Sequence, residues 1–422
     1  MPLRKSDYEN AMKIHYFGPI KDQLENSTAL LSRMERYEQE TGGVHLQLPT
    51  RTGRTTSIGA RGDTGITGQT LPAGDRPTYS VATFTVKPQY LTIRVTGFAM
   101  RSARNPTFAF ARAQTRDMED SVKDFKKDIN RQLFGDGSGR LAKPVTGDST
   151  VVVFTSDLYP TRPTHFMYAR ELLDFLIVTT GLIAEVTAGS IGNAVVTVDS
   201  ATQATMTTIV DLVSTTDAPY RQDNVTGTDI KEMYGLDAVI DDSNPDAIHT
   251  SPAPVTGDFG NIDRATVTSW QAQMLSNSGT LRAFSVNLVE QGIDKPEENA
   301  GGEVSLLQTN YAIFRIYGAL LAAAKTADMA KMDLDGGFKA LSVNGVPMVR
   351  DVDSPDYRIF CIDESTFYLG VTGDWAWLED DGGGILSRIS QEDLYEAVLN
   401  RDMQLMCDKP SASCKIEDVS HS

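Results

Sequence analysis

The sequence predicts a mixed fold of helices and strands, of the α+β class, and three observations support this prediction. Residues 107–134 carry the longest helical pattern in the chain, residues 50–78 form a glycine-rich excursion that returns into a strong strand, and strand-like stretches dominate residues 143–250. Helix-like and strand-like segments do not alternate regularly, as they would in a doubly wound parallel sheet.

Composition limits the possible function classes. The 422 residues suffice for two or three domains, and 40% hydrophobic with 23% charged residues is typical of a soluble globular protein. The formal net charge of −17 argues against a protein that grips nucleic acid over a broad basic face. Residues 1–61 differ, with nine Lys or Arg against seven Asp or Glu. This segment could face a polyanion, although a solvated surface explains the same charges.

Residues 16–40 predict an amphipathic helix. Pro19 suits the first helical turn, and the residues at helical spacing are Ile20, Leu24, Ser27, Leu31 and Met34. The stretch precedes any core, so we expect an N-terminal arm that docks on another surface.

Residues 50–78 predict an extended loop. They contain six glycines, two prolines and few large apolar residues, so they cannot bury a core. They lead into YLTIRVTGF at 90–98, whose alternating apolar residues predict a half-buried strand. We therefore expect a two-stranded ribbon that projects from the body. Such a ribbon would be stable only if a neighbouring subunit covered it.

Residues 107–134 predict a helix about 40 Å long. The apolar stripe along it consists of Phe108, Ala111, Thr115, Met118, Val122, Phe125, Ile129 and Leu133. The opposite face carries Arg112, Arg116, Asp117, Glu119, Lys123, Lys126, Lys127 and Arg131. A narrow apolar stripe of this kind suits a helix laid across a sheet.

The glycines that follow, in LFGDGSGRLA at 133–142, resemble a phosphate-binding loop. However, their spacing lacks the third glycine of a dinucleotide fingerprint, and they follow a helix where the fingerprint needs a strand. We therefore interpret Gly135, Gly137 and Gly139 as the end of the helix. Alanine at Gly135 or Gly137 is expected to impair folding or assembly.

The rest of the chain predicts short elements. Strands are expected at 149–155, 192–200, 206–214, 340–351, 357–370 and 403–408; residues 170–178 could be helix or buried strand, and 223–254 look like loop. Helices are expected at 264–277, 303–331 and 391–400.

Two acidic clusters invite a metal-site interpretation. In MDLDGG, Asp333 and Asp335 precede Gly336, but the glycine comes too early for a calcium loop and no glutamate closes it. The second cluster consists of Glu379, Asp380 and Asp381. Solvated turns explain both clusters better.

The remaining chemistry-like features are weak. The five histidines (His15, His45, His165, His249 and His421) include no HExxH pair, and Cys361, Cys407 and Cys414 form no CxxC pair. The chain has no P-loop, no nucleophile motif and no apolar run long enough for a signal peptide or a membrane span. Residues 61–63 spell RGD by chance or as a receptor motif. We predict no catalytic, cofactor-binding or metal-binding residues, no cofactor and no enzymatic activity.

The order of these features resembles the major capsid proteins of tailed bacteriophages, which have the Hong Kong 97-like fold. FGPIKDQLENSTALLSRME resembles the family's N-terminal arm, and GQTLPAGDRPTYSVATFTVKPQYLTIRVTGF resembles the returning half of its extended loop. FAFARAQTRDMEDSVKDFKKDINRQLFGDGSGRLA is similar to the spine helix and its glycine turn. LDGGFKALSVNGVPMVRDVDSPDYRIF and MQLMCDKPSASCKIEDV are similar to the C-terminal half.

The resemblance implies an arm (1–50), an extended loop (51–98) and a peripheral domain (99–250) with the spine helix and a β-rich, inserted segment. A mainly axial domain (251–385) and a C-terminal return to the peripheral domain (386–422) would follow. It implies a structural protein of the virion that self-assembles through pentamers and hexamers into an icosahedral shell around double-stranded DNA. Expected partners are scaffolding, portal and decoration proteins and loosely held DNA, with assembly in the host cytoplasm and no membrane.

Some members of this family cross-link a loop lysine to a neighbouring asparagine. No lysine lies between Lys21 and Lys87, so we expect no such bond. Three alternatives remain open: an encapsulin-type compartment with the same fold, a hydrolase or metal enzyme using the acidic loops, and a receptor-binding or decoration module using the RGD loop.

Overall fold

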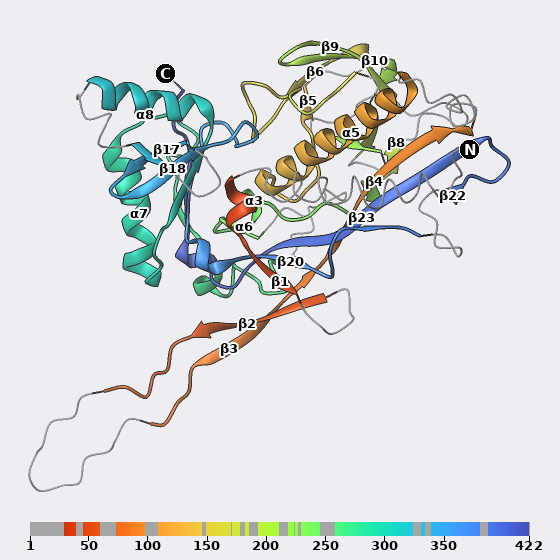
Figure 1. Cartoon of the computed structure of the whole chain (residues 1–422). Helices are drawn as coiled ribbons and strands as arrows, with labels where there is room; N and C mark the ends of the chain where they lie inside the picture. Colours follow the sequence, from red (N-terminus) through yellow and green to blue (C-terminus); the bar gives the residue numbers. More distant parts are fainter. Residues whose placement is uncertain are drawn as a thin grey trace, which may run out of the picture.

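The computed structural model describes most of the chain outside the N-terminal segment. The described residues are 29–38, 45–59, 73–97, 109–145, 149–169, 171–177, 182–184, 193–210, 218–222, 224–226, 229–244, 258–323, 331–333, 339–379 and 387–421. Figure 1 shows a body of helices and sheets from which one two-stranded ribbon projects. In the described part of the chain, no helix is both long enough and apolar enough to span a bilayer.

The largest hydrophobic core lies between helix α5 (Ala109–Phe134) and a six-stranded sheet. The sheet runs in the order β1 (Glu35–Glu38), β20 (Phe367–Val371), β23 (Leu394–Cys407) and β21 (Ala376–Trp377), and β4 (Lys87–Thr96) and β22 (Ser387–Arg388) also pair with β23. Val122, Phe125, Ile129 and Leu133 of α5 are buried in this core. The ring of Phe125 meets that of Trp375 edge to face at 5.6 Å. The helix predicted at 107–134, and its position across a sheet, are confirmed.

A second core fills the region where α7 (Val286–Ala300) and α8 (Tyr311–Ala323) pack on a seven-stranded sheet. Its strands run in the order β14 (Gln273–Leu275), β24 (Cys414–Ile416), β19 (Ile359–Ile362), β15 (Leu306–Thr309), β18 (Val346–Arg350), β17 (Lys339–Val343) and β16 (Lys331–Asp333). The short 3-10 helices η3 (Glu364–Thr366) and η4 (Pro410–Ala412) each lie between a strand of this sheet and a strand of the first sheet, and η2 (Thr268–Trp270) precedes β14.

The β-rich segment has a core of its own. Its sheet runs in the order β11 (Ala218–Arg221), β7 (Leu172–Ile177), β9 (Asn193–Ser200), β10 (Gln203–Val210), β6 (Ser149–Thr155) and β5 (Lys143–Pro144), with β8 (Leu182–Ala184) beside β7. The pair β12 (Val225–Thr226) and β13 (Asp229–Ile230) and the short helix α6 (Leu236–Val239) follow. The strands predicted at 149–155 and 192–200 are confirmed, 170–178 forms a strand, and the expected loop at 223–254 contains these three short elements.

The predicted helix at 16–40 is only partly correct. Residues 1–28 lie outside the described part, and α3 (Ala29–Arg33) is helical. Residues 35–38 instead form β1, which pairs in parallel with β20, Glu35 opposite Tyr368. Strand pairing in the sheet therefore overrides the local helical pattern.

The helix predicted at 391–400 is wrong, because residues 391–393 form a turn and residues 394–400 belong to β23. Ten residues of β23 pair with β4, from Leu394 opposite Thr96 to Met403 opposite Lys87. Strands β20, β21 and β22 pair with it as well. These long-range ladders, which helical spacing cannot reveal, decide the conformation.

The helices predicted at 264–277 and 303–331 also need correction. The first stretch holds η2 and β14, fixed by side chains such as that of buried Arg264, which donates hydrogen bonds to the carbonyls of Ala238 and Val239. In the second, β15 precedes α8, which starts after Asn310 because the Asn310 side chain accepts a hydrogen bond from the main chain of Ile313.

Helix α7 was not predicted from the sequence. It is capped by Ser285, whose side chain accepts a hydrogen bond from the Leu288 N–H, and it ends at Gly301 with φ of 62°. Pro296 lies inside the helix, just before its last turn, and an internal proline usually argues against a helix.

Candidate assembly surface

The projecting ribbon consists of β2 (His45–Gly53) and β3 (Thr78–Thr85). They pair antiparallel, with Leu46 opposite Phe84 and Leu48 opposite Ala82. The predicted two-stranded projection is thus confirmed, but its returning strand is β3. The strand expected at 90–98 corresponds to β4, which pairs with β23 in the body. The ribbon also begins at His45, inside the range expected to be arm.

The base of the ribbon is fixed to the body. Phe84 is buried and packs edge to face on Phe259 at 5.2 Å. The Thr83 N–H donates to the Gly260 carbonyl at 2.8 Å. Gly260 has φ of 61°, and a Cβ there would lie 2.9 Å from the Phe84 ring, so this contact requires glycine. The ribbon therefore leaves the body in a defined direction.

The outer half of the ribbon is exposed on one strand. Tyr79 of β3 is 67% exposed and Val81 53%, whereas Thr50 of β2 is buried and the Thr52 carbonyl accepts a hydrogen bond from the Ser269 hydroxyl of η2. In the loop beyond the ribbon, Ile58 is 68% exposed. Isolated two-stranded ribbons are marginally stable in water, and exposed apolar groups of this kind mark interaction sites. The ribbon thus presents apolar surface that the described residues of its own chain do not cover.

Beyond the paired strands, Asp75 holds the two legs of the loop together. Its carboxylate accepts hydrogen bonds from the Thr56 hydroxyl at 2.6 Å and the Thr56 N–H at 3.2 Å. Its carbonyl accepts from the hydroxyls of Thr55 and Ser57. The bonds from Thr56 lower the pKa of Asp75. The legs therefore stay side by side past the end of the ladder.

The ribbon is basic, unlike the chain as a whole. Residues 45–85 contain four arginines and two aspartates, with no lysine or glutamate, in a chain of net charge −17. Arg51, Arg54 and Arg76 are exposed. The ribbon therefore carries charge opposite to that of most of the protein.

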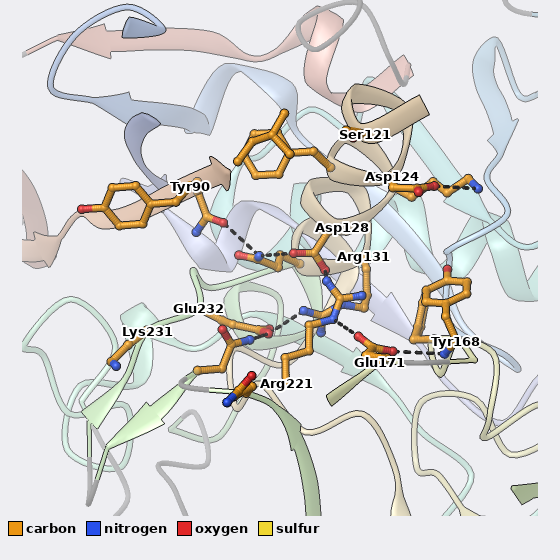
Figure 2. Close-up of a pocket in the computed structure, with 18 of the residues that line it drawn as sticks. Tyr90, Ser121, Asp124, Asp128, Arg131, Tyr168, Glu171, Arg221, Lys231 and Glu232 are labelled. Carbon is orange, nitrogen blue, oxygen red and sulfur yellow. Dashed lines mark hydrogen bonds and ion pairs between the residues drawn. The ribbon is translucent and has the colours of Figure 1, made fainter. Parts of the chain in front are cut away.

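A second feature is a groove of about 860 Å³ between α5, β4 and the β-rich segment (Figure 2). An ion-pair network lies along it. Arg131 of α5 pairs with Asp128 and with Glu232, and Arg221 of β11 pairs with Asp128 and with Glu171. Asp128 thus pairs with two arginines, one from α5 and one from β11 of the β-rich segment. From the sequence, Arg131 was expected on the face opposite the apolar stripe, and in the structure its side chain on that helix is buried.

The network pairs two arginines with three carboxylates, and these pairs offset the effect of burial on most of its members. Burial opposes the charge on Arg131, but Glu232 and Asp128 raise its pKa overall. Burial likewise works against the Asp128 carboxylate, yet Arg131 and Arg221 lower its pKa. Burial raises the pKa of Glu171 in spite of Arg221. The network therefore joins the helix to the β-rich segment.

The glycine turn ends α5 as expected. Gly137 and Gly139 have φ of 77° and 75°, whereas Gly135 is not in the left-handed region. Asp136 fixes the turn, since its carboxylate accepts hydrogen bonds from the N–H and hydroxyl of Ser138. Burial opposes ionisation of Asp136, but Arg140 and Ser138 lower its pKa.

The other residues weighed from the sequence do not come together. Asp333 lies at the end of β16 and Glu379 after β21, while Asp335, Gly336, Asp380, Asp381 and the RGD tripeptide lie outside the described residues. His45 contacts Thr85 in the ribbon, His165 lies 3.4 Å from the Asp353 carboxylate, and His421 accepts a hydrogen bond from the Tyr357 N–H. His15 and His249 lie outside the described residues. No cluster of three or more potential metal ligands occurs among the described residues.

Cys361, Cys407 and Cys414 are buried free thiols, and none of them forms a disulfide. Burial raises the pKa of Cys407 and of Cys414 to about 12, and raises that of Cys361 as well. A thiol with so high a pKa is a poor nucleophile at neutral pH.

No family model and no curated protein matches the sequence. Among solved structures, the capsid protein of cyanophage A-1(L) is similar over 94% of both chains, with 12% identity and a TM-score of 0.52. A Mycobacterium phage Adephagia chain (11% identity, 93% and 90% coverage, TM-score 0.42) and an encapsulin complex from Synechococcus elongatus (10% identity, 93% and 88% coverage, TM-score 0.43) are more distant and support no inference. The first similarity confirms that the chain has the Hong Kong 97-like capsid fold.

Proposed function

We propose that this protein is the major capsid protein of a tailed bacteriophage, whose copies assemble into the icosahedral shell around a double-stranded DNA genome. The observation that carries the proposal is the ribbon. It is fixed at its base, exposed at Tyr79 and Val81, and belongs to a chain with a capsid fold. Contacts between different surfaces of identical chains close into rings and shells, and such contacts would bury the ribbon.

The domain roles follow from the same fold. The core under α5 corresponds to the peripheral domain, and the core with α7 and α8 corresponds to the axial domain that would gather around five-fold and six-fold axes. We propose the boundaries 1–50, 51–98, 99–250, 251–385 and 386–422 for these parts, with the arm sharing residues 45–50 with the ribbon. Two ranges contribute to both cores: β20 and β21 of 251–385 belong to the six-stranded sheet, and β24 of 386–422 belongs to the seven-stranded sheet.

The proposed partners are chiefly other copies of the chain, in pentamers and hexamers. Scaffolding, portal and decoration proteins complete the proposal, with assembly in the host cytoplasm and a final location in the virion. The net charge of −17 supports weak, non-specific contact with packaged DNA. The role is structural, without catalysis, cofactor or membrane.

Electron microscopy and sedimentation of the purified protein test the proposal. Closed shells, or pentamers and hexamers that convert into shells, are the expected result. A stable monomer at assembly concentrations, with or without a co-expressed scaffolding protein, would contradict it.

An encapsulin-type compartment is the alternative within the same fold. The contents of shells purified from the native source separate the two functions. Double-stranded DNA inside the shell supports the phage capsid, whereas a single packaged enzyme supports the compartment.

A further inference from the structure

Two of the three cysteines lie directly opposite each other on neighbouring strands. Strands β19 and β24 pair antiparallel, with Cys361 opposite Cys414. Residues opposite each other in such a pair point to the same face of the sheet, and their Cα atoms are about 4.5–5.5 Å apart. A disulfide joins residues whose Cα atoms are about 4.4–6.8 Å apart. The backbone therefore already holds these two cysteines at a distance that a disulfide can bridge.

Both side chains enter the same core, under helix α7. Cys361 and Cys414 belong to the cluster between α7, α8 and the seven-stranded sheet, and neither is exposed. A Cβ at Gly292 of α7 would lie 3.1 Å from the Cys361 Sγ and 2.6 Å from the Ile416 side chain. Ile416 shares a face with Cys414, because residues two apart on a strand point the same way. Helix α7 therefore lies over the face that carries both thiols and shields it from solvent.

The third cysteine, Cys407, has a different environment. It lies on β23 opposite Phe367 and belongs to the core under α5. Its thiol donates a hydrogen bond to the Thr366 hydroxyl. Cys407 therefore opposes no cysteine, and the strand register selects one pairing among those that three cysteines allow.

The position of the pair along the chain would give a disulfide a structural effect. The chain leaves the seven-stranded sheet after β19, forms β20, β21, β22 and β23 of the six-stranded sheet, and returns to the seven-stranded sheet as β24. A bond between residues 361 and 414 would close this excursion at its two crossing points. Closing a long loop reduces the conformational freedom of the unfolded chain and thereby stabilises the fold.

We propose that Cys361 and Cys414 form a disulfide when the protein meets an oxidising medium, which joins the two chain crossings between the sheets. The oxidant is a low-molecular-weight disulfide such as oxidised glutathione. The thiolate of one cysteine attacks it, forms a mixed disulfide and releases one glutathione thiolate. The thiolate of the other cysteine attacks the protein sulfur of the mixed disulfide and releases the second. Each released thiolate takes up a proton that a cysteine lost, so two protein thiols become one disulfide while oxidised glutathione becomes two thiols.

Burial controls when this reaction occurs. It raises the pKa of Cys361, and it raises that of Cys414 to about 12 although Lys295 of α7 acts in the opposite direction. Little thiolate therefore exists while the strands are closed, and oxidation proceeds through local opening of β24. The reducing cytoplasm preserves the thiols, whereas a particle released from the cell acquires the disulfide. This timing rests on the proposed capsid function, but the disulfide itself does not.

Thiol mapping of the wild-type subunit tests the proposal. The subunit is equilibrated in glutathione redox buffers with urea just below the unfolding midpoint, so that β24 opens, and the remaining thiols are alkylated. Proteolysis that includes cleavage before Asp408 separates Cys407 from Cys414, and mass spectrometry identifies the linked peptides. We expect the linkage of 361 to 414 to exceed any linkage to Cys407 at least about tenfold. Its absence at every glutathione ratio, or linkages to Cys407 in similar amount, would overturn the proposal.

Two matched variants test the structural effect. Cys407→Ala keeps the proposed pair and Cys414→Ala removes it, and both replace a buried thiol by a methyl group. Oxidation should raise the melting temperature of the wild type and of Cys407→Ala by about 3 °C or more, and leave that of Cys414→Ala unchanged. An equal rise in Cys414→Ala would assign the effect to another modification, and no rise in the wild type would show that these positions hold no stabilising disulfide. Either result would overturn the proposal.

Particles from the native source separate this inference from the proposed function. The linkage should be present in released particles and absent from subunits alkylated during cell lysis. Free thiols at residues 361 and 414 in released particles would overturn the proposed timing. A wild-type protein that forms no shells would instead refute the capsid function and leave the mapping result on the subunit valid.

Discussion

At the scale of single residues, the turn after α5 separates glycines that look equivalent in the sequence. Gly137 has φ of 77°, and a Cβ there would lie 2.7 Å from the Tyr234 ring. At Gly135 the nearest atom would be the Gln132 carbonyl oxygen at 3.4 Å, with φ outside the left-handed region. The expectation that alanine is damaging at both positions is therefore kept only for Gly137.

We predict that Gly137→Ala lowers the free energy of unfolding by about 1–3 kcal/mol, because it adds a left-handed non-glycine residue and a steric contact. Gly135→Ala is the matched control and should change it by less than about 0.5 kcal/mol. Urea denaturation of the unassembled subunit measures both. A smaller loss at Gly137 than at Gly135 would refute this account of the turn.

The second prediction at the residue scale concerns the pH dependence of stability, which follows from an ion pair of a buried lysine. Lys415 of β24 is fully buried and donates hydrogen bonds to Asp241 at 2.5 Å and Asp237 at 3.1 Å. Burial raises the pKa of Asp241, but Lys415 outweighs this and lowers it to about 2. The carboxylate therefore stabilises the fold above its ordinary pKa of 3.8, and this stabilisation is lost as the pH falls through about 2.

Asp241→Asn should accordingly lower the free energy of unfolding at pH 5 by about 2 kcal/mol, and the difference from wild type should shrink as the pH falls from 4 toward 2. Urea denaturation at stepped pH values measures this. Asp124→Asn is the control, because the Asp124 side chain is 78% exposed. This variant should show the same loss of stability at acid pH as the wild type. A constant difference at every pH would contradict the ion-pair explanation.

At the scale of elements, the ribbon divides into an anchored base and an exposed outer half. Phe84 is 1% exposed in the core, whereas Tyr79 on the same strand is 67% exposed. The two aromatic residues should therefore contribute to different properties of the protein.

We predict that Phe84→Ala lowers the free energy of unfolding of the subunit by about 3–5 kcal/mol, as for other buried aromatic residues. Tyr79→Ala should leave subunit stability within about 0.5 kcal/mol of wild type and weaken assembly. Thermal unfolding of the subunit and sedimentation of shells measure the two effects separately. Equal stability losses in both variants would show that the outer half is packed within the subunit.

The long strand β23 shows why the helix predicted at 391–400 was wrong. LYEAVLN has the composition and spacing of a helix, yet it pairs with β4, β20, β21 and β22. By contrast, α5 has enough turns for its apolar period to be unmistakable, and its predicted range was confirmed.

At the scale of the whole molecule, the chain lacks the lysine that some members of this fold class use for covalent cross-linking. No lysine occurs between Lys21 and Lys87, so the ribbon and its loop contain no amine nucleophile. We predict that mature particles boiled in denaturant run as a single monomer band on a gel. A ladder of covalent multimers would refute this.

The sequence by itself determined the features with local causes: the long helix, its glycine end, the ribbon and the mixed fold class. Each arises from patterns within some 30 residues, where periodicity and glycine content act directly. It also gave the resemblance that the cyanophage capsid structure later confirmed at the level of the fold.

Only the tertiary structure decided the features made by residues distant in sequence. Three of these features depend on long-range packing. Asp128 pairs with both Arg131 and Arg221, β23 pairs with four other strands, and the ring of Phe84 contacts that of Phe259. Which strands pair, and in which register, depends on both partner strands, so the sequence of one strand alone does not determine it.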